Sequence, residues 1–453
     1  MIRPPVSPTR VLEEPALFLL LMRNCASAPG ESRPRVRVPC PQIVYTKAMN
    51  MRAYALVTSA YWTFTVTDGA LRMLVLLYFH DLGFSPISLA LLFVLYELLG
   101  VFTNLIGGWI GARFGLHRTL TSGLALQVVA LLVLTAVSPA WNQGFAVAWV
   151  MGAQALSGVA KDLTKMSAKS AVKVVVAEGS LFRFVALLTG SKNALKGAGF
   201  FVGAALLSWL GFRPALLVMA VAVGAALAVV VFRLGDLGRV ESKPPLAAVL
   251  RKSGSIRRLS LARFFLFGAR DIWFVVALPV FLDDVLGWPF PSIGAFLAVW
   301  VIGYGAVQAS APRIMAEFRE TTLGAYGLLL PMAAIVCIIA VSVQSSQLKA
   351  LITVAGLLFF GVMFALTSSV HSFLILAYSK SDDDVAMDVG YYYSANAAGR
   401  LIGTVLSGVL YTIGGFPAAL VGTAVFLIVT LLVSLRLPPA GPHTQRRSHV
   451  GVS

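Results

Sequence analysis

The chain has few charged residues for its length. Of its 453 residues, 12% are charged and 58% are hydrophobic, whereas a soluble domain needs roughly a quarter charged residues to cover its surface. The mean hydropathy of +0.84 agrees with this shortage. The composition therefore argues against a soluble globular protein and indicates a chain that exposes most of its outer surface to lipid.

Cysteine is scarce as well. Its three cysteines are Cys25, Cys40 and Cys337, and the last lies inside an apolar segment. This usage implies neither a disulfide framework nor a cysteine-ligated metal site. The acidic run 382–384 is expected to be a solvated loop. We therefore predict no metal site and no cofactor.

The motifs of common enzymes are missing too. The chain has no G-x-x-x-x-G-K-[ST] phosphate loop, no nucleophile elbow and no H-E-x-x-H pair, so it is predicted not to be an enzyme and not to use ATP directly. Its net charge of +17 suggests nucleic acid at first. The basic residues lie mostly in short loops between apolar segments, however, which predicts contact with membrane lipid and no nucleic acid partner.

Long apolar runs are what the sequence has in abundance. Each run is long enough to cross a bilayer and must be helical there, because lipid offers the backbone no hydrogen-bond partner. Twelve such spans are predicted, at 54–80, 86–111, 118–138, 141–163, 181–210, 214–234, 259–282, 292–313, 321–343, 350–378, 386–411 and 416–437. The predicted fold class is an all-α polytopic membrane protein.

The spans group into two bundles of six helices, 54–234 and 259–437, joined by a predicted cytoplasmic linker at 235–258. Residues 1–53 are predicted to be a disordered or mis-annotated extension, because their one apolar run is too short to span. Residues 438–453 are predicted to be a cytoplasmic tail. Basic residues crowd the loops on one side, so the positive-inside rule places both termini in the cytoplasm. We expect a multi-pass protein of the inner, cytoplasmic membrane.

The two bundles also resemble each other in sequence. Phe79 matches Phe281, Phe212 matches Phe416, and the segment 191–194 matches 394–397, at offsets of 202 to 204 residues. Three places at nearly one offset favour a duplicated six-helix unit over chance. This is the architecture of major facilitator transporters.

The loop after the second span resembles the major facilitator loop signature, in which glycines allow a tight turn and basic residues hold a cytoplasmic gate. The residues that carry the resemblance are Gly108, Arg113, Gly115 and Arg118. The signature's usual aspartate is replaced by Ala112, so the gate bond of that aspartate is in doubt. An ordinary glycine-rich turn is the alternative.

We single out nine ionisable residues within the spans, where a charge is costly unless it faces the bundle interior, a partner or water. They are Asp68, Arg72, Glu97, Lys192, Lys196, Arg263, Arg270, Asp271 and Arg400. Asp68 and Arg72 are four residues apart and share a helix face, so they form either a mutual ion pair or proton relay, or a substrate contact. Arg270 and Asp271 are the counterpart pair in the second bundle.

Six of these residues are cations and three are acids, and such an excess in a dry site is unfavourable unless an anion neutralises it. A multiply charged, phosphate-like substrate fits both arginine forks and lysine point charges. The predicted substrate-binding residues are Arg72, Lys192, Lys196, Arg270, Asn396 and Arg400. The predicted coupling or charge-relay residues are Asp68, Glu97 and Asp271. Arg263, near the end of its span, is expected to be structural.

Four longer segments resemble the ArsJ-type organoarsenical efflux permeases of the major facilitator superfamily. They are TDGALRMLVLLYFH (67–80), ALSGVAKDLTKMSAKSAVK (155–173), ALLTGSKNALKGAGFF (186–201) and LFGARDIWFVVALPV (266–280). The resemblance extends over 54–437. It implies export of 1-arseno-3-phosphoglycerate, which glyceraldehyde-3-phosphate dehydrogenase forms from arsenate, and hence arsenate resistance. The dehydrogenase is thus a functional partner, with no direct contact implied.

Two other functions remain open at this stage. One is a major facilitator exchanger of phosphorylated metabolites, or a drug–proton antiporter. The other is a receptor or scaffold that transports nothing, but cations buried in both bundles would then have no purpose.

Overall fold

The computed structural model describes residues 51–438, except 115, 176–177, 236–251, 315–326, 346–347 and 380–381. Every regular element within these residues is an α-helix. The predicted extension up to residue 50, the linker over 236–251 and the tail from residue 439 lie outside the described residues. Residues 1–46 form a separate unit from 47–453, and only the second unit is discussed below.

The first bundle begins with a long helix, and local signals mark the starts of α3 and α8. Its elements are α2 (Met51–Asp81), α3 (Pro86–Leu91), α4 (Val94–Phe114), α5 (Leu116–Leu134), α6 (Gln143–Val175), α7 (Glu178–Leu210) and α8 (Phe212–Arg233). The Ser85 hydroxyl caps α3 by accepting from the backbone N–H of Ser88. Gly211, with φ of 81°, makes the tight turn between α7 and α8 that a side chain would strain.

The second bundle contains α10 (Gly254–Phe274), α11 (Ala277–Asp284), α12 (Phe290–Ile314), α14 (Leu329–Ser345), α15 (Lys349–Tyr378) and α16 (Asp382–Ser434). The helix is interrupted between α10 and α11. There the Ser407 hydroxyl accepts hydrogen bonds from the backbone N–H groups of Val276 and Ala277, at 3.1 and 3.0 Å. The α16 helix contains the last two predicted spans, which meet at the non-helical Gly414 and Gly415.

The described helices occupy all twelve predicted spans. Eight helices are long and apolar enough to cross a membrane by length and composition alone. One of them, over 388–434, contains two predicted spans, so the eight helices account for nine of the twelve. Of the remaining three, α14 is apolar but shorter, while α2 and α6 carry buried charges. Some boundaries differ from the prediction. The α6 helix continues to Val175 beyond residue 163, and α10 begins at Gly254, inside the predicted linker.

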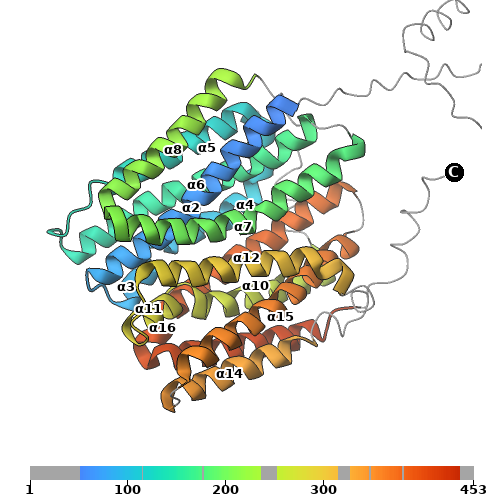
Figure 1. The fold of residues 1–453 in the computed structure, drawn as a ribbon. Coiled ribbons are helices and arrows are strands. Elements are labelled where there is room, and N and C mark those ends of the chain that lie inside the picture. Colours follow the sequence, from blue (N-terminus) through green and yellow to red (C-terminus); the bar gives the residue numbers. More distant parts are fainter. Residues whose placement is uncertain are drawn as a thin grey trace, which may run out of the picture. The chain divides into compact units, whose positions relative to one another are not determined.

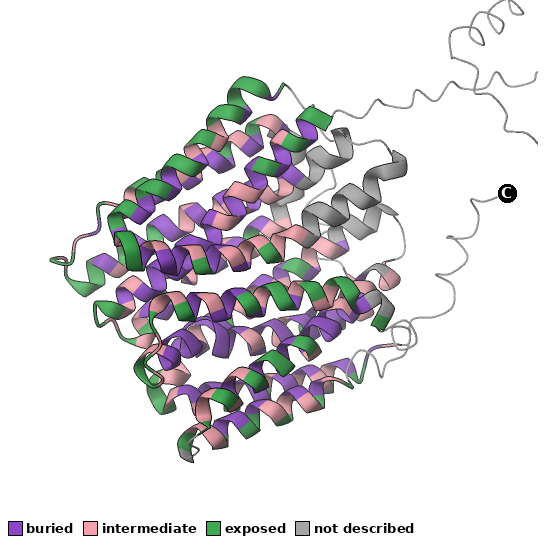
Figure 2. Ribbon diagram, in the orientation of Figure 1, coloured by how far each residue is buried: buried purple, intermediate pink, exposed green. Residues whose placement is uncertain are grey.

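Exposed residues lie along many helices (Figure 2), and many of them are large and apolar. On α8 the exposed fraction reaches 71% for Val221 and 82% for Phe232. In water such a surface would aggregate, whereas in a bilayer it faces lipid tails. The exposed apolar surface thus agrees with the composition.

Glycines let the inner helices approach closely. Side chains at Gly199 and Gly203 of α7 would overlap the backbone of α2, and those at Gly399 and Gly403 of α16 would overlap the backbone of α10. Small residues four apart bring membrane helices into contact in this way. Figure 1 shows α2 and α7 next to each other. The equivalent helix pair of each bundle is therefore joined by the same device.

The bundles meet along two seams. In one, α7 packs against α12, where Gly197 lies against the Ala298 carbonyl. In the other, α3 and α4 pack against α16, and the Ser394 hydroxyl donates to the Val101 carbonyl oxygen at 2.9 Å. These seams bring the middle of α2, α4 and α7 close to the middle of α10 and α16.

Replacing Gly203 with valine should destabilise the protein by about 1–3 kcal/mol, because the new side chain would push α7 away from α2. Gly224→Val is the matched control, since a Cβ at Gly224 has no neighbour within 4 Å. The thermal unfolding midpoint in detergent measures both. Equal midpoints for the two variants would contradict the close packing of α2 and α7.

Candidate functional site

Asp68 anchors one side of a polar cluster midway along α2. Its Oδ1 accepts from the Tyr96 hydroxyl at 2.6 Å, and its Oδ2 lies 3.7 Å from Nζ of Lys196 on α7. Asp68 is 7% exposed, so these partners compensate a carboxylate taken out of water. The first helix is thus tied to α4 and α7 through one acid.

Arg72, one turn further along α2, contacts a different acid. Its Nη1 donates to Oε1 of Glu97 on α4 at 2.9 Å. The guanidinium also lies over the rings of Phe93 and Tyr96, 5.1 and 5.9 Å from their centroids. Of the alternatives for Asp68 and Arg72, the mutual ion pair is not found among the described residues, because each side chain contacts a residue of a neighbouring helix.

Glu97 is also the link between the two bundles. The same Oε1 accepts from Nη2 of Arg400 on α16. Arg400 in turn donates through Nε to Oδ2 of Asp271 on α10, at 3.1 Å. Asp271 Oδ1 accepts from Nε of its neighbour Arg270 at 2.6 Å, so the predicted pairing of Arg270 with Asp271 is present. The result is a continuous chain in which cations and acids alternate from α2 to α10.

Three cations of the cluster are more exposed than its acids, although the difference is small between Arg72, at 10%, and Asp68, at 7%. The side chains of Lys196 and Arg400 are each 19% exposed and that of Arg270 is 16% exposed. The side chains of Glu97 and Asp271 are each 1% exposed. The acids therefore lie behind the cations, and the accessible surface of the cluster is positive.

The cluster includes two residues that the sequence did not single out as site residues. The Lys161 ammonium of α6 lies 3.9 Å from the Tyr96 ring centroid, and Tyr96 itself donates to Asp68. Lys161 shares a predicted helix face with Gln154 and Ser157, which was the available signal. Within the described residues the contacts just given join five cations to three acids. Lys161 also acts electrostatically on a further buried acid, Asp162, so the excess of positive charge is at most about two, rather than the predicted three.

A second polar group, on α4 and α6, was not predicted from the sequence. Asp162, 2% exposed, accepts from the hydroxyl of Thr103 on α4. Nζ of Lys165 lies 3.5 Å from the other carboxylate oxygen and donates to Oδ1 of Asn104 at 3.0 Å. Asp162 adds a fourth buried acid to the predicted three. It lies between two lysines in the sequence, so this stretch was interpreted as basic and its acid was overlooked.

Arg263 stands apart from the cluster, as predicted. It donates to the Ser368 hydroxyl at 2.9 Å and to the Ser368 carbonyl at 3.1 Å, and it stacks on the Phe267 ring at 4.0 Å. Neutral acceptors and an aromatic face thus hold this cation.

The other predicted residues are placed as follows. Lys192 and Asn396 are partly buried one turn before Lys196 and Arg400, so each shares a helix face with a cluster residue. The buried Oδ1 of Asn396 has no hydrogen-bond donor among the described residues. In the gate loop, Arg118 is exposed on α5. Gly115, the surroundings of Gly108 and the Arg113 side chain lie outside what the structure describes. The gate therefore stays a prediction.

In the part of the chain that the structure describes, the helices pack around a charged cluster near the middle of α2. The sequence profile of the Major Facilitator Superfamily matches residues 57–381. The chain belongs to the major facilitator superfamily. It is accordingly a secondary transporter of a small molecule in a lipid bilayer, and the predictions of fold class and of a non-enzymatic protein are confirmed.

Solved structures share the superfamily fold. One is a bacterial homologue of the iron transporter ferroportin in an inward-facing state, with a TM-score of 0.67 and 13% identity, covering 86% of this chain and 99% of that one. Another is a POT family transporter in complex with 5-aminolevulinic acid, with a TM-score of 0.64 and 12% identity, covering 85% and 95%. No curated protein matches the sequence.

The Glu97→Gln variant should unfold at a markedly lower temperature, because Arg72 and Arg400 would lose a shared buried partner. Breaking a buried ion pair costs about 3–5 kcal/mol. Asp81→Asn, at an exposed acid of α2, is the control and should unfold like the unmodified protein. A thermal melt in detergent gives both values.

The pairing is tested further by a double-mutant cycle with Arg400→Gln. The second substitution should cost less in the Glu97→Gln background than alone, because the bond is already lost. Strictly additive costs would mean that the two side chains do not interact.

Proposed function

We propose that this transporter exports a multiply charged organic anion, and that its substrate is the organoarsenical 1-arseno-3-phosphoglycerate. The observation that carries the proposal is the positive accessible surface at mid-depth, formed by Lys196, Arg270 and Arg400 in front of buried acids. Such a surface favours anions and repels cations. While no substrate is bound, the site holds a buried net positive charge, which is unfavourable. An anion that enters therefore lowers the free energy of the site.

The chemistry of the cations matches a phosphate or arsenate ester. Arginine forks bind such tetrahedral oxyanions through two parallel hydrogen bonds, and lysine adds a point charge. Two arginines and a lysine from α7, α10 and α16 provide more than one anchor. A molecule with phosphate at one end and an arsenate ester at the other needs two.

Unsatisfied polar atoms support a ligand at this place. Among the described residues, neither Nη2 of Arg72 nor Oδ1 of Asn396 has a partner, although both are buried. An unpaired buried donor or acceptor costs about 1–3 kcal/mol, which a bound molecule would recover. A glycerate backbone offers a hydroxyl for the amide oxygen and anionic oxygens for the guanidinium.

The resemblance to ArsJ-type permeases lies in the segments that build the cluster. The segment 67–80 contains Asp68 and Arg72, 155–173 contains Lys161 and Asp162, 186–201 contains Lys196, and 266–280 contains Arg270 and Asp271. Glu97 and Arg400 lie outside these four segments, although within the wider range 54–437 over which the resemblance extends. The resemblance is the reason for proposing the arsenate ester among the possible anions.

The proposed direction is export because the substrate is made inside the cell, and the basic loops predict that the termini face this cytoplasmic side. The substrate then enters from the side on which glyceraldehyde-3-phosphate dehydrogenase makes it. Its oxyanions compete with Glu97 and Asp271 for Arg400, and the released carboxylates become available to take up protons. Asp68, Glu97 and Asp271 are thereby the proposed coupling acids.

Everted membrane vesicles test the function directly. Supplied with the dehydrogenase, glyceraldehyde 3-phosphate, NAD and arsenate, vesicles that contain the protein should accumulate arsenic. Omission of the dehydrogenase should abolish the uptake. If uptake does not exceed that of vesicles without the protein, the proposed substrate is wrong.

Variants and competitors sharpen the same assay. Lys196→Gln should lower uptake by at least about tenfold, since one anchor for the anion is lost, whereas Lys349→Gln at the start of α15 should not. An exchanger of phosphorylated metabolites is the alternative, because the same cations would bind any phosphate ester. Equally strong transport of 3-phosphoglycerate would favour that alternative.

A further inference from the structure

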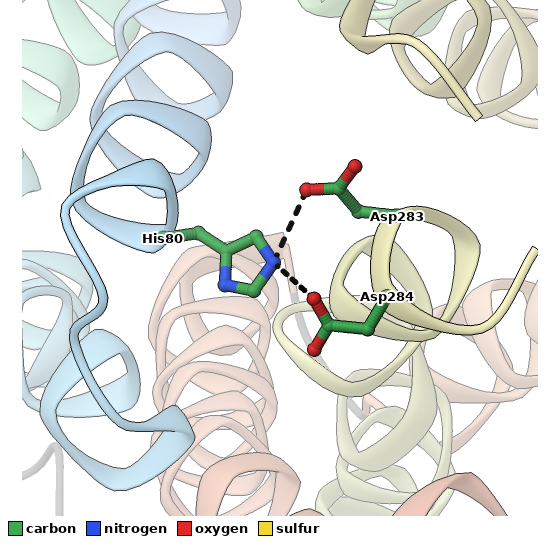
Figure 3. Close-up of side chains that lie close together, drawn as sticks. All are labelled: His80, Asp283 and Asp284. Carbon is green, nitrogen blue, oxygen red and sulfur yellow. Dashed lines mark hydrogen bonds and ion pairs between the residues drawn. The ribbon is translucent and has the colours of Figure 1, made fainter. Parts of the chain in front are cut away.

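Three ionisable side chains converge at the ends of α2 and α11, far along both helices from the central cluster. The His80 Nε2 lies 3.1 Å from Asp284 Oδ1 and 3.2 Å from Asp283 Oδ2. Figure 3 shows both carboxylates directed at the same ring nitrogen. His80 belongs to the first bundle and the two aspartates to the second.

A single histidine nitrogen cannot donate a hydrogen bond to both carboxylates. Nε2 carries at most one hydrogen, yet two carboxylate oxygens approach it at hydrogen-bond distance. Asp81 and Tyr411 also lie close enough to act electrostatically on this acidic pair. Adjacent carboxylates repel each other, so the arrangement favours a positive charge between them.

The donor set is that of a metal site. One imidazole nitrogen and two carboxylate oxygens suit a first-row divalent metal such as zinc better than calcium or magnesium, which prefer oxygen alone. The three donor atoms lie within 4.8 Å of one another. Zinc bonds of about 2.0–2.2 Å place neighbouring donors roughly 3–3.5 Å apart, which the two histidine–aspartate distances already meet.

We propose that His80, Asp283 and Asp284 form a binding site for a divalent transition metal that joins the two bundles at this end. The metal would replace the single proton shared by the histidine and the acids, and water would fill its remaining coordination positions. The site differs from the proposed substrate site in place and in charge. Its occupancy would hold the ends of α2 and α11 together.

A consequence for transport follows. Alternating access requires the two bundles to separate at one end and then at the other. Metal bound across α2 and α11 would oppose separation at their shared end. Micromolar zinc should therefore slow transport by the unmodified protein, whatever its substrate.

Isothermal titration with zinc chloride tests the site. The full chain is purified in detergent with an affinity tag that contains no histidine, and one zinc ion should bind per chain. His80→Ala should weaken binding by more than about tenfold, as should Asp283→Asn and Asp284→Asn. Arg233→Gln, at an exposed residue at the end of α8, should bind zinc like the unmodified protein.

His80→Cys separates ligation from structure, because a thiolate binds zinc and should restore affinity that alanine loses. Co²⁺ provides a readout without substitutions, since its visible absorption should appear on binding and disappear when zinc displaces it. Absence of saturable zinc and cobalt binding by the unmodified protein would overturn the proposal. Undiminished zinc affinity in His80→Ala would overturn it as well.

Discussion

The ion pair between Glu97 and Arg400 is the interaction on which the rest of the structure depends. The two residues are 303 positions apart, on α4 and α16, and their bond joins the two bundles at mid-depth. Each forms a further ion pair: Glu97 also binds Arg72, and Arg400 also binds Asp271. In a low-dielectric interior neither group is stable without the other. The glycine contacts of α7 with α2 and of α16 with α10 position the helices that carry this network.

The arrangement reconciles two opposing needs of a transporter. A buried charge must be neutralised, or the protein unfolds. A charge that is fully neutralised has nothing left for a substrate. Here the acids are buried and saturated, while Lys196, Arg270 and Arg400 keep part of their surface accessible. Ion pairs that bridge the bundles can also exchange partners when an anion arrives, which links binding to the relative position of the helices.

Hydropathy alone predicted the helices, because lipid allows few alternatives to a helix. The duplicated pattern and the matched positions predicted the superfamily. Seven of the nine charged positions lie together in the structure, whereas Arg263 lies apart. The pairing was not predictable. Spacing of four residues suggested that Asp68 binds Arg72, but the sequence contains no information on which helix faces which. Asp162 escaped notice because Lys161 and Lys165 flank it. Pro279 is a local signal for the interruption after Phe274, since a proline removes the hydrogen bond to the carbonyl four residues before it, but the sequence does not show that Ser407 satisfies the freed N–H groups.

The central claim is that an excess of accessible positive charge selects an anion. Binding of 3-phosphoglycerate, a stable relative of the proposed ester, tests it most directly when compared with glycerol under equal conditions in purified protein. The account predicts saturable stabilisation against heat by 3-phosphoglycerate, loss of that stabilisation in Lys196→Gln, and no effect of glycerol. Equal stabilisation by the neutral molecule, or undiminished stabilisation of the variant by 3-phosphoglycerate, would contradict it.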